Sequence, residues 1–184
     1  YEDQNLAYKL TRDLRNAAEA LDKALQGPQV QAQLQIVQSG VKEMDNQAQL
    51  YVHLKKNSEG NGVKDADVVR HFLDALKASN IAAEQGLKLV ESEYQTFEKS
   101  LYQLRQAIGG GLKVNTVELD LVVAPVLQKL GPVNQVRTFL QSVLNASSGV
   151  LQPIAKERQV TREMEMQVIV QVVTNYLDGL VSQN

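Results

Sequence analysis

The chain has 184 residues, a length that suits one ordinary domain with a core of its own. Hydrophobic residues make up 43% and charged residues 22%, which is typical of a globular protein and excludes a disordered one. The formal net charge is -2, and no stretch is enriched in Lys and Arg, so we expect no nucleic-acid partner. Every wholly apolar run is far shorter than the roughly 20 residues of a membrane-spanning helix, so we expect no transmembrane segment.

Cysteine and tryptophan are both absent. A chain without Cys forms no disulfide, thiolate metal site or cysteine nucleophile. This composition favours a location outside the cytoplasm, periplasmic or secreted, where free thiols are prone to oxidation. The chain begins at Tyr1 rather than Met, so we expect that a preceding segment has been removed. Aromatic residues make up only 5%, which favours packing of helices through Leu, Val and Ala over a β-sheet.

The first part of the sequence predicts two helices. Apolar residues recur in alternating steps of three and four over 3–26 and again over 28–56, which places each set along one helix face. Gly27-Pro28 separates the two, because Gly favours the position after a helix end and Pro suits the first turn of the next helix. A polar loop is expected over 57–62, after which Asp65 can cap a third helix.

The most regular pattern lies between Val69 and Ile108. It continues without interruption, so we predict a single helix of about 40 residues that is about 60 Å long, and therefore an elongated protein. Asn80 is the polar residue in this apolar seam. A buried seam Asn can fix the register of helix pairing, or bind a polar ligand if it faces a cavity. Gly109-Gly110-Gly111 ends the helix and is interpreted as a flexible connection.

The region after the three glycines is less regular. Asn115-Thr116-Val117-Glu118 resembles a capping box, which predicts a helix. The alternation over 117–123 also fits a strand, and Pro125 disfavours a long helix. We predict a short or kinked helix over 116–130 and leave a strand over 116–123 open.

The end of the chain predicts two more helices. One begins at Gly131-Pro132 and ends near 147–149, and a turn is expected around Pro153. Thr161 can cap the other, whose apolar seam includes Met166, Val173 and Tyr176. In sum, the sequence predicts an all-α fold, an elongated bundle of five or six unequal helices with heptad-patterned, coiled-coil-like packing. We treat 1–184 as one domain, with a subdivision after residue 111 as the second interpretation.

No group of residues predicts catalysis. Asp67, His71 and Asp74 share one helix face and could hold a divalent ion together with an outside ligand. The same spacing gives ordinary ion pairs on a solvated face, which is our interpretation. His53 has no acid–base partner nearby in the sequence and is interpreted as a half-buried structural residue. We therefore expect no catalytic residue, no cofactor and no metal.

The segment 117–155 is the best candidate for a partner surface, because it has few charges and contains the apolar run from Leu121 to Leu127. A regular amphipathic helix would show a polar side within such a run. We therefore expect part of it to be exposed, as a dimer seam or a docking site. The residues selected for this role are Leu121, Val122 and Val126, together with Asn80.

Three functions agree with these features. The first is a non-enzymatic helical module that binds a protein partner, or a second copy of itself, through its helix faces. The second is a ligand-sensing helical ectodomain of a membrane receptor, which requires a cavity between helices. The third is a helical-bundle fragment of a cytosolic tethering or scaffold protein.

Overall fold

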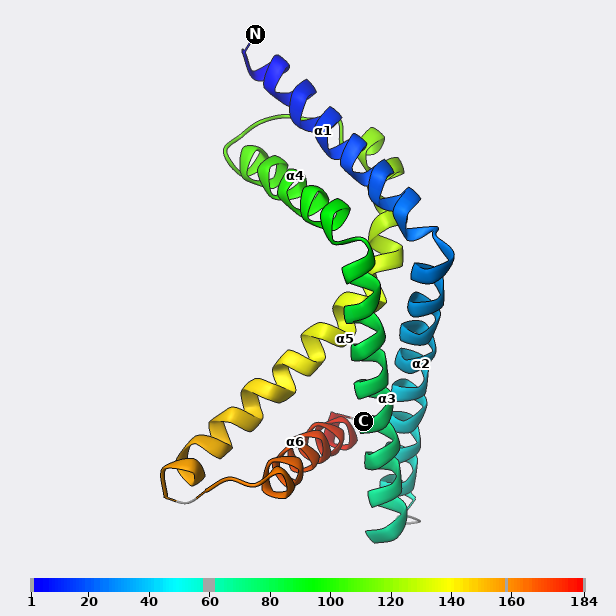
Figure 1. Cartoon of the computed structure of the whole chain (residues 1–184), viewed down its shortest axis with the longest axis vertical. Coiled ribbons are helices and arrows are strands. Elements are labelled where there is room, and N and C mark those ends of the chain that lie inside the picture. The colour runs from blue at the N-terminus through cyan, green and yellow to red at the C-terminus, as the bar shows by residue number, and fades with distance from the viewer. Residues whose placement is uncertain (1, 58–61, 158, 184) are drawn as a thin grey trace. The chain divides into compact units, whose positions relative to one another are not determined.

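The computed structural model describes residues 2–57, 62–157 and 159–183. Within these ranges the chain is all-α, with six helices and no strand, which confirms the predicted fold class. No helix in the described ranges combines the length and the apolarity needed to cross a membrane. The helices (Figure 1) are α1 (Glu2–Leu25), α2 (Pro28–Lys56), α3 (Gly62–Leu89), α4 (Glu91–Gly109), α5 (Thr116–Glu157) and α6 (Arg162–Gln183).

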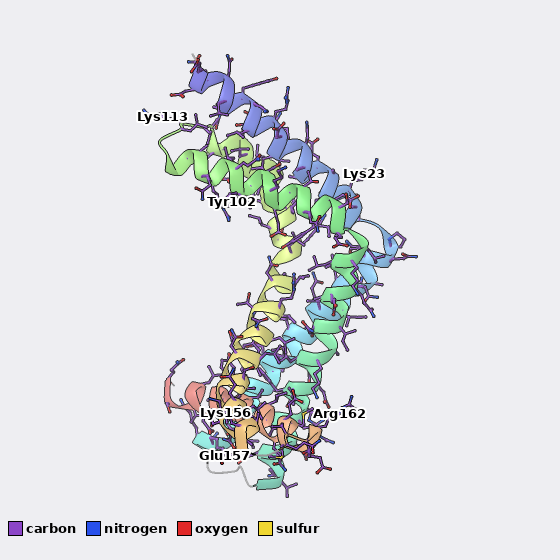
Figure 2. All side chains as sticks on the ribbon, turned by 60° about the vertical axis from the view of Figure 1, so that its left-hand side comes forward. Lys23, Tyr102, Lys113, Lys156, Glu157 and Arg162 are labelled. Carbon is purple, nitrogen blue, oxygen red and sulfur yellow. The ribbon has the colours of Figure 1, made fainter. Side chains whose placement is uncertain are left out.

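The first two helices form where the apolar periodicity predicts them, with Gly27 and Pro28 at the junction. Their buried side chains follow the predicted seams, because positions three and four apart share one helix face. Basic residues at the ends of α1 and of the later helix α5 add to helix stability. Lys23 lies in the last turn of α1 and Lys156 in the last turn of α5 (Figure 2), where positive charge is favoured by the helix dipole.

The single helix predicted between 69 and 108 is wrong, because the chain leaves helical geometry at Val90 (Figure 1). Val90 has φ −121° and ψ 21°, and its N–H bonds to the carbonyl of Leu87 at 3.2 Å, three residues back rather than four. Val90, Phe97 and Leu104 are nevertheless all buried at the predicted spacing. The heptad pattern reports burial and does not detect one non-helical residue. The prediction of an elongated protein was based on the length of this single helix, so this segment no longer supports it.

Gly110 and Gly111 form a helix cap at the end of α4. Gly111 has φ 102°, in the left-handed region that Gly adopts without strain. The N–H of Leu112 bonds to the carbonyl of Ala107 at 2.9 Å, and the N–H of Gly111 to that of Ile108 at 3.0 Å. This pair of bonds defines a Schellman motif, which satisfies carbonyls of the last turn. That the glycines also allow bending stays a prediction.

The predicted breaks between residues 130 and 153 are wrong, because α5 runs without interruption from Thr116 to Glu157. The alternative of a strand over 116–123 is likewise wrong. Each proline removes one helical N–H and displaces the carbonyl four residues earlier. For Pro125, Pro132 and Pro153 those carbonyls belong to exposed residues, so water can satisfy them and the helix continues.

The predicted helix caps have mixed outcomes. Thr161 Oγ1 accepts a hydrogen bond from the Met164 N–H at 3.2 Å, and Asn115 Oδ1 accepts one from the Glu118 N–H at 3.4 Å, which confirms the starts of α6 and α5. Asp65 does not cap α3, which begins at Gly62. Its carboxylate instead accepts a hydrogen bond from the Lys55 ammonium at 2.6 Å.

The chain divides into two compact units, each made of two stretches that are distant in sequence. Unit 1 comprises the described residues of Tyr1–Gln35 and Ala82–Pro132, and unit 2 those of Ile36–Ile81 and Val133–Asn184. The three boundaries, at 35/36, 81/82 and 132/133, lie inside helices, so α2, α3 and α5 each contribute to both units. The interpretation of a subdivision after residue 111 differs from this arrangement.

Unit 1 is built on the packing of α4 against α1. Its core combines the buried side chains of α1 with Phe97 and Leu104 of α4 and with buried apolar residues of α5. Two ion pairs, Arg15 with Glu118 and Lys129 with Asp22, join α1 to α5. At the exposed surface such pairs contribute little to stability, so the apolar contacts carry most of it.

Unit 2 contains a very close approach of α2 and α3. A Cβ atom added to Gly40 would lie 1.6 Å from Oγ and 2.9 Å from Cβ of Ser79, so only Gly fits. Ser79 is fully buried, and its hydroxyl donates to the carbonyl of Ala75 at 2.6 Å, which satisfies it within its own helix. The two helices therefore form a tightly packed pair against which α5 and α6 of this unit are arranged.

Candidate ligand-binding cavity

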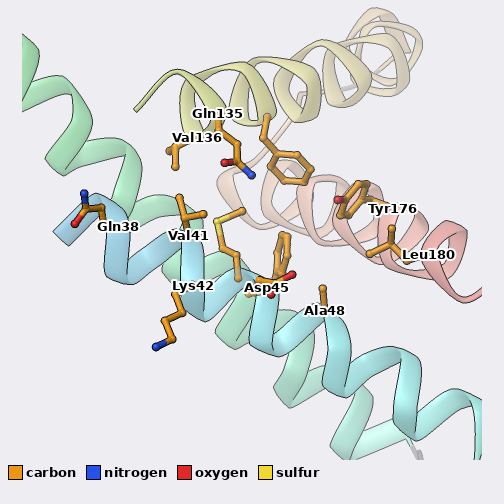
Figure 3. A pocket seen from close by; sticks show the side chains of 12 residues that line it. Gln38, Val41, Lys42, Asp45, Ala48, Gln135, Val136, Tyr176 and Leu180 are labelled. Atoms are coloured by element: carbon orange, nitrogen blue, oxygen red, sulfur yellow. The ribbon is translucent and has the colours of Figure 1, made fainter. Parts of the chain in front are cut away.

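A cavity of about 490 Å³ lies in unit 2, among α2, α3, α5 and α6 (Figure 3). A volume of this size is typical of small-molecule binding sites. All four helices contribute apolar or aromatic side chains to it. They are Val41, Met44 and Ala48 of α2, Phe72 of α3, Val136 and Phe139 of α5, and Tyr176 and Leu180 of α6.

Three aromatic rings from three different helices form one wall of the cavity. The centroids of Phe139 and Tyr176 are 4.8 Å apart with the rings at 70°, and those of Phe72 and Phe139 are 5.7 Å apart at 69°. Edge-to-face contacts of this kind are favourable beyond the area that they bury. Phe72 is buried whereas Tyr176 is 43% exposed, so the cluster extends from the core to the cavity surface.

The apolar face of α2 is less buried where it lines the cavity than on either side of it. Val37 and Tyr51, at either end of this segment, are 0% and 1% exposed. Val41, Met44 and Ala48 continue the same seam between them, yet they are only half-buried. This part of the apolar seam is partly exposed inside a concave site. A ligand that bound there would remove it from water, which favours binding.

Neutral polar side chains point into the cavity, and two charged residues, Lys42 and Asp45, also belong to its lining. Figure 3 shows the amide of Gln135 directed from α5 toward α2, and the Tyr176 side chain facing the same space from α6. The Lys42 side chain leads away from it (Figure 3). The carboxylate of Asp45 accepts a hydrogen bond from Gln49 Nε2 at 3.0 Å, so this charge already has a partner. The cavity therefore offers an apolar body with uncharged hydrogen-bonding groups, and its two charged lining residues, Lys42 and Asp45, are exposed to solvent.

A polar contact holds α6 against α2 beside the cavity. Tyr51 is 1% exposed, and its hydroxyl donates a hydrogen bond to Asp178 of α6. Burial, together with the bond to this carboxylate, raises the pKa of Tyr51 far above its ordinary value of 10.0. The hydroxyl therefore keeps its proton, and remains a donor, throughout the neutral range.

The residues that the sequence selected for interaction lie in different surroundings. Leu121 is 75% exposed, Val122 is half-buried, and Val126 is fully buried in the core of unit 1. Asn80 is half-buried and does not line this cavity. The fully buried polar residue of α3 is its neighbour Ser79, which the apolar pattern did not identify.

The two histidines lie on exposed surface. Asp67, His71 and Asp74 are exposed, and Asp67 pairs with Arg70 at 3.5 Å. Among the residues that the structure describes, no three His, Cys, Asp or Glu side chains are gathered as a metal site would require. His53 is exposed rather than half-buried as predicted, with Asn57 Nδ2 2.9 Å from its Nδ1.

Sequence reasoning placed Val41, Met44, Ala48 and Tyr176 on helix seams but missed the cavity that they share. Gln135 and Phe139 gave no signal, since nothing in a single sequence pairs α5 with α2 and α3. Comparison with family models, with curated proteins and with solved structures finds no significant match to this chain.

Proposed function

We propose that this chain is a non-enzymatic helical module that binds a small, uncharged, amphiphilic molecule in the cavity of unit 2. The observation that carries the proposal is the half-buried seam of Val41, Met44 and Ala48 facing an aromatic wall inside a concave space. Binding would bury this seam without requiring a partner for any charge. The proposal agrees with the ligand-sensing function that the sequence allows.

The lining groups define the class of ligand. Its apolar part, a ring system or a short branched chain, would lie between the α2 seam and Phe139. Its polar part, a carbonyl or a hydroxyl, would bond to the Gln135 amide or to the Tyr176 hydroxyl, both of which can donate and accept. Neutral polar groups fix orientation at a low desolvation cost, whereas a charged ligand would lack a buried counter-charge here.

Nile red, a neutral aromatic dye whose fluorescence rises when it leaves water, tests this proposal. At about −0.3 kcal/mol per non-hydrogen atom, a dye of this size should bind with a Kd on the order of 10 μM. The variant Ala48→Phe fills the cavity from α2. We expect it to weaken binding by at least about tenfold, with an unchanged or raised melting temperature because the added ring covers the apolar seam.

The matched control is Ala78→Phe, which adds the same ring at an exposed position of α3 in the same unit. It should leave the dye affinity unchanged. Equal affinities of the wild-type protein and Ala48→Phe would show that the dye binds elsewhere, and the proposed function would then be wrong.

A second candidate function, self-association, is favoured by an exposed apolar stripe on α5. Val117 and Leu121 are 72% and 75% exposed, and Ala124 and Pro125 continue the same face one turn later. We propose a second copy of this chain as the partner, because a stripe at this spacing can pair with itself about a two-fold axis. The stripe is short, so the dimer would be weak.

Sedimentation equilibrium tests self-association. Leu121→Lys should abolish a concentration-dependent dimer while leaving the melting temperature nearly unchanged, since an exposed substitution is worth about 0.5 kcal/mol or less. Leu144→Lys, at another exposed Leu of α5, is the control. Val126 cannot serve in this test, because it belongs to the core. A wild-type chain that stays monomeric at millimolar concentration would exclude this function.

A further inference from the structure

A shallow groove of about 260 Å³ adjoins the ligand cavity of unit 2. The apolar part of its lining consists of Ala48 and Val52 of α2 and Leu180 of α6, all of them half-buried. Ala48 and Leu180 also line the larger cavity, so the two spaces meet at these side chains. Ala48 carries only a methyl group, which leaves room for a chain to pass from one space to the other. The groove therefore extends the ligand cavity.

This extension runs along α2. Val41, Ala48 and Val52 are seven and four residues apart, a spacing that places their side chains on one face of the helix. At a rise of about 1.5 Å per residue, the distance from Val41 to Val52 is about 16 Å. Figure 3 shows Gln135 toward the Val41 end of the cavity, with Ala48 and Leu180 at the other end. The neutral amide and the groove thus lie at opposite ends of one long, narrow space.

The rim of the groove is polar. Asp45, Gln49 and Lys56 complete the lining, and all three are exposed. Gln49 Nε2 donates to the Asp45 carboxylate at 3.0 Å, so these two groups satisfy each other. The hydrogen bond from Tyr51 to Asp178 joins α2 to α6 and so keeps the two walls of the groove together. A chain in the groove would contact the apolar side chains while the rim groups stay in water.

We propose, resting on the proposed function, that the ligand is a neutral phenol-like molecule whose unbranched alkyl tail lies along Ala48, Leu180 and Val52. An aromatic ring suits the wall formed by Phe139, and its hydroxyl can bond to the Gln135 amide. A tail para to that hydroxyl leads away from Gln135 and toward the groove. An unbranched tail is narrow enough to lie between α2 and α6, whereas a compact branched group of the same size would leave Val52 uncovered.

Calorimetric titration of the full chain with isomeric phenols tests the shape of the tail. The isomers para-pentylphenol and para-tert-pentylphenol contain the same atoms, so a general preference for apolar solutes affects both alike. We expect the straight isomer to bind at least about fivefold more tightly than the branched one and than para-ethylphenol, because each partly buried methylene is worth about twofold in affinity. Equal affinities of the two isomers would overturn the proposal.

The variant Val52→Asn tests where the tail lies, since it replaces the last apolar side chain of the groove by a polar one of similar size. It should reduce the preference for the straight isomer to less than about twofold, because the end of the tail would no longer cover an apolar group. Leu50→Asn, a similar change at an exposed position of α2 outside both spaces, is the matched control and should keep the preference. A preference that persists in Val52→Asn would contradict the assigned position of the tail. The comparison of isomers in the wild-type protein does not depend on whether either variant folds.

The same titrations separate this proposal from the proposed function. Binding of para-ethylphenol that is weakened in Ala48→Phe, without any preference for the straight isomer, would keep the cavity as the binding site and overturn only the position of the tail. Failure of all three phenols to bind would overturn both.

Discussion

Tyr51 combines two roles that its position on the helix seam alone does not suggest. Its ring is part of the core of unit 2, and its hydroxyl bonds to Asp178 across the interface between α2 and α6. A buried hydroxyl needs such a partner, because leaving it unpaired costs roughly 1–3 kcal/mol. The seam pattern predicted that Tyr51 is buried, whereas the acceptor that makes this burial favourable lies far away in sequence, on the last helix.

The raised pKa of Tyr51 predicts how stability depends on pH at the alkaline end. The unfolded chain releases this proton near the ordinary pKa of 10.0, whereas the folded protein retains it to higher pH. The contribution to stability is therefore complete below pH 10 and is lost as the pH rises above that value. Urea denaturation at about pH 8 and about pH 11 should show a fall in unfolding free energy that is smaller in Tyr51→Phe than in the wild-type protein.

Tyr102→Phe provides the control for this comparison, since Tyr102 is 63% exposed on α4 (Figure 2) and removal of its hydroxyl breaks no buried contact. The same alkaline loss of stability in wild-type protein and Tyr51→Phe would contradict the assigned role of the Tyr51 hydroxyl.

At the scale of helices, the sequence was most informative where burial repeats along one face. The seams of α1 and α2 and the cap of α6 by Thr161 were predicted correctly, since these depend on neighbours three or four residues apart. The break at Val90 and the continuity of α5 through its prolines were not. Both depend on what surrounds the backbone: Val90 is buried, and the residues whose carbonyls Pro125 and Pro153 displace are exposed.

Gly40 shows how a single missing side chain sets the distance between two helices. In an isolated helix, Ala is about 1 kcal/mol more favourable than Gly. In unit 2 the added Cβ would overlap Ser79, and overpacking of this kind costs about 1–3 kcal/mol. We therefore expect Gly40→Ala to lower the free energy of unfolding, measured by urea denaturation, despite its better helix propensity.

Gly149→Ala is the matched control for this substitution. Gly149 lies within α5 of the same unit, and a methyl group added there would meet no atom within 4 Å, so Ala should stabilise by up to about 1 kcal/mol. Stabilisation by both substitutions would mean that α2 and α3 separate at little cost, and that the wall of the ligand cavity is not rigid.

At the scale of the whole molecule, the candidate sites depend on which helices meet, and a single sequence carries little information on that. The aromatic wall requires Phe72, Phe139 and Tyr176 to converge from α3, α5 and α6. Periodicity gives the buried face of each helix, but it does not say which faces are joined or where their packing leaves a cavity. The sequence therefore predicted an all-α bundle correctly and placed its interaction residues on α3 and α5, outside the cavity.

The chain contains three methionines, which allows the central claim to be tested directly. Met44 lines the cavity, whereas Met164 and Met166 lie on α6 outside it. In protein labelled with ¹³C at the Met methyl groups, titration with naphthol, a neutral bicyclic alcohol, should shift the Met44 resonance through the ring current of the bound molecule. The resonances of Met164 and Met166 should stay in place, and Ala48→Phe should suppress the Met44 shift. A Met44 resonance that does not move at saturating naphthol, or equal movement of all three, would contradict binding in this cavity.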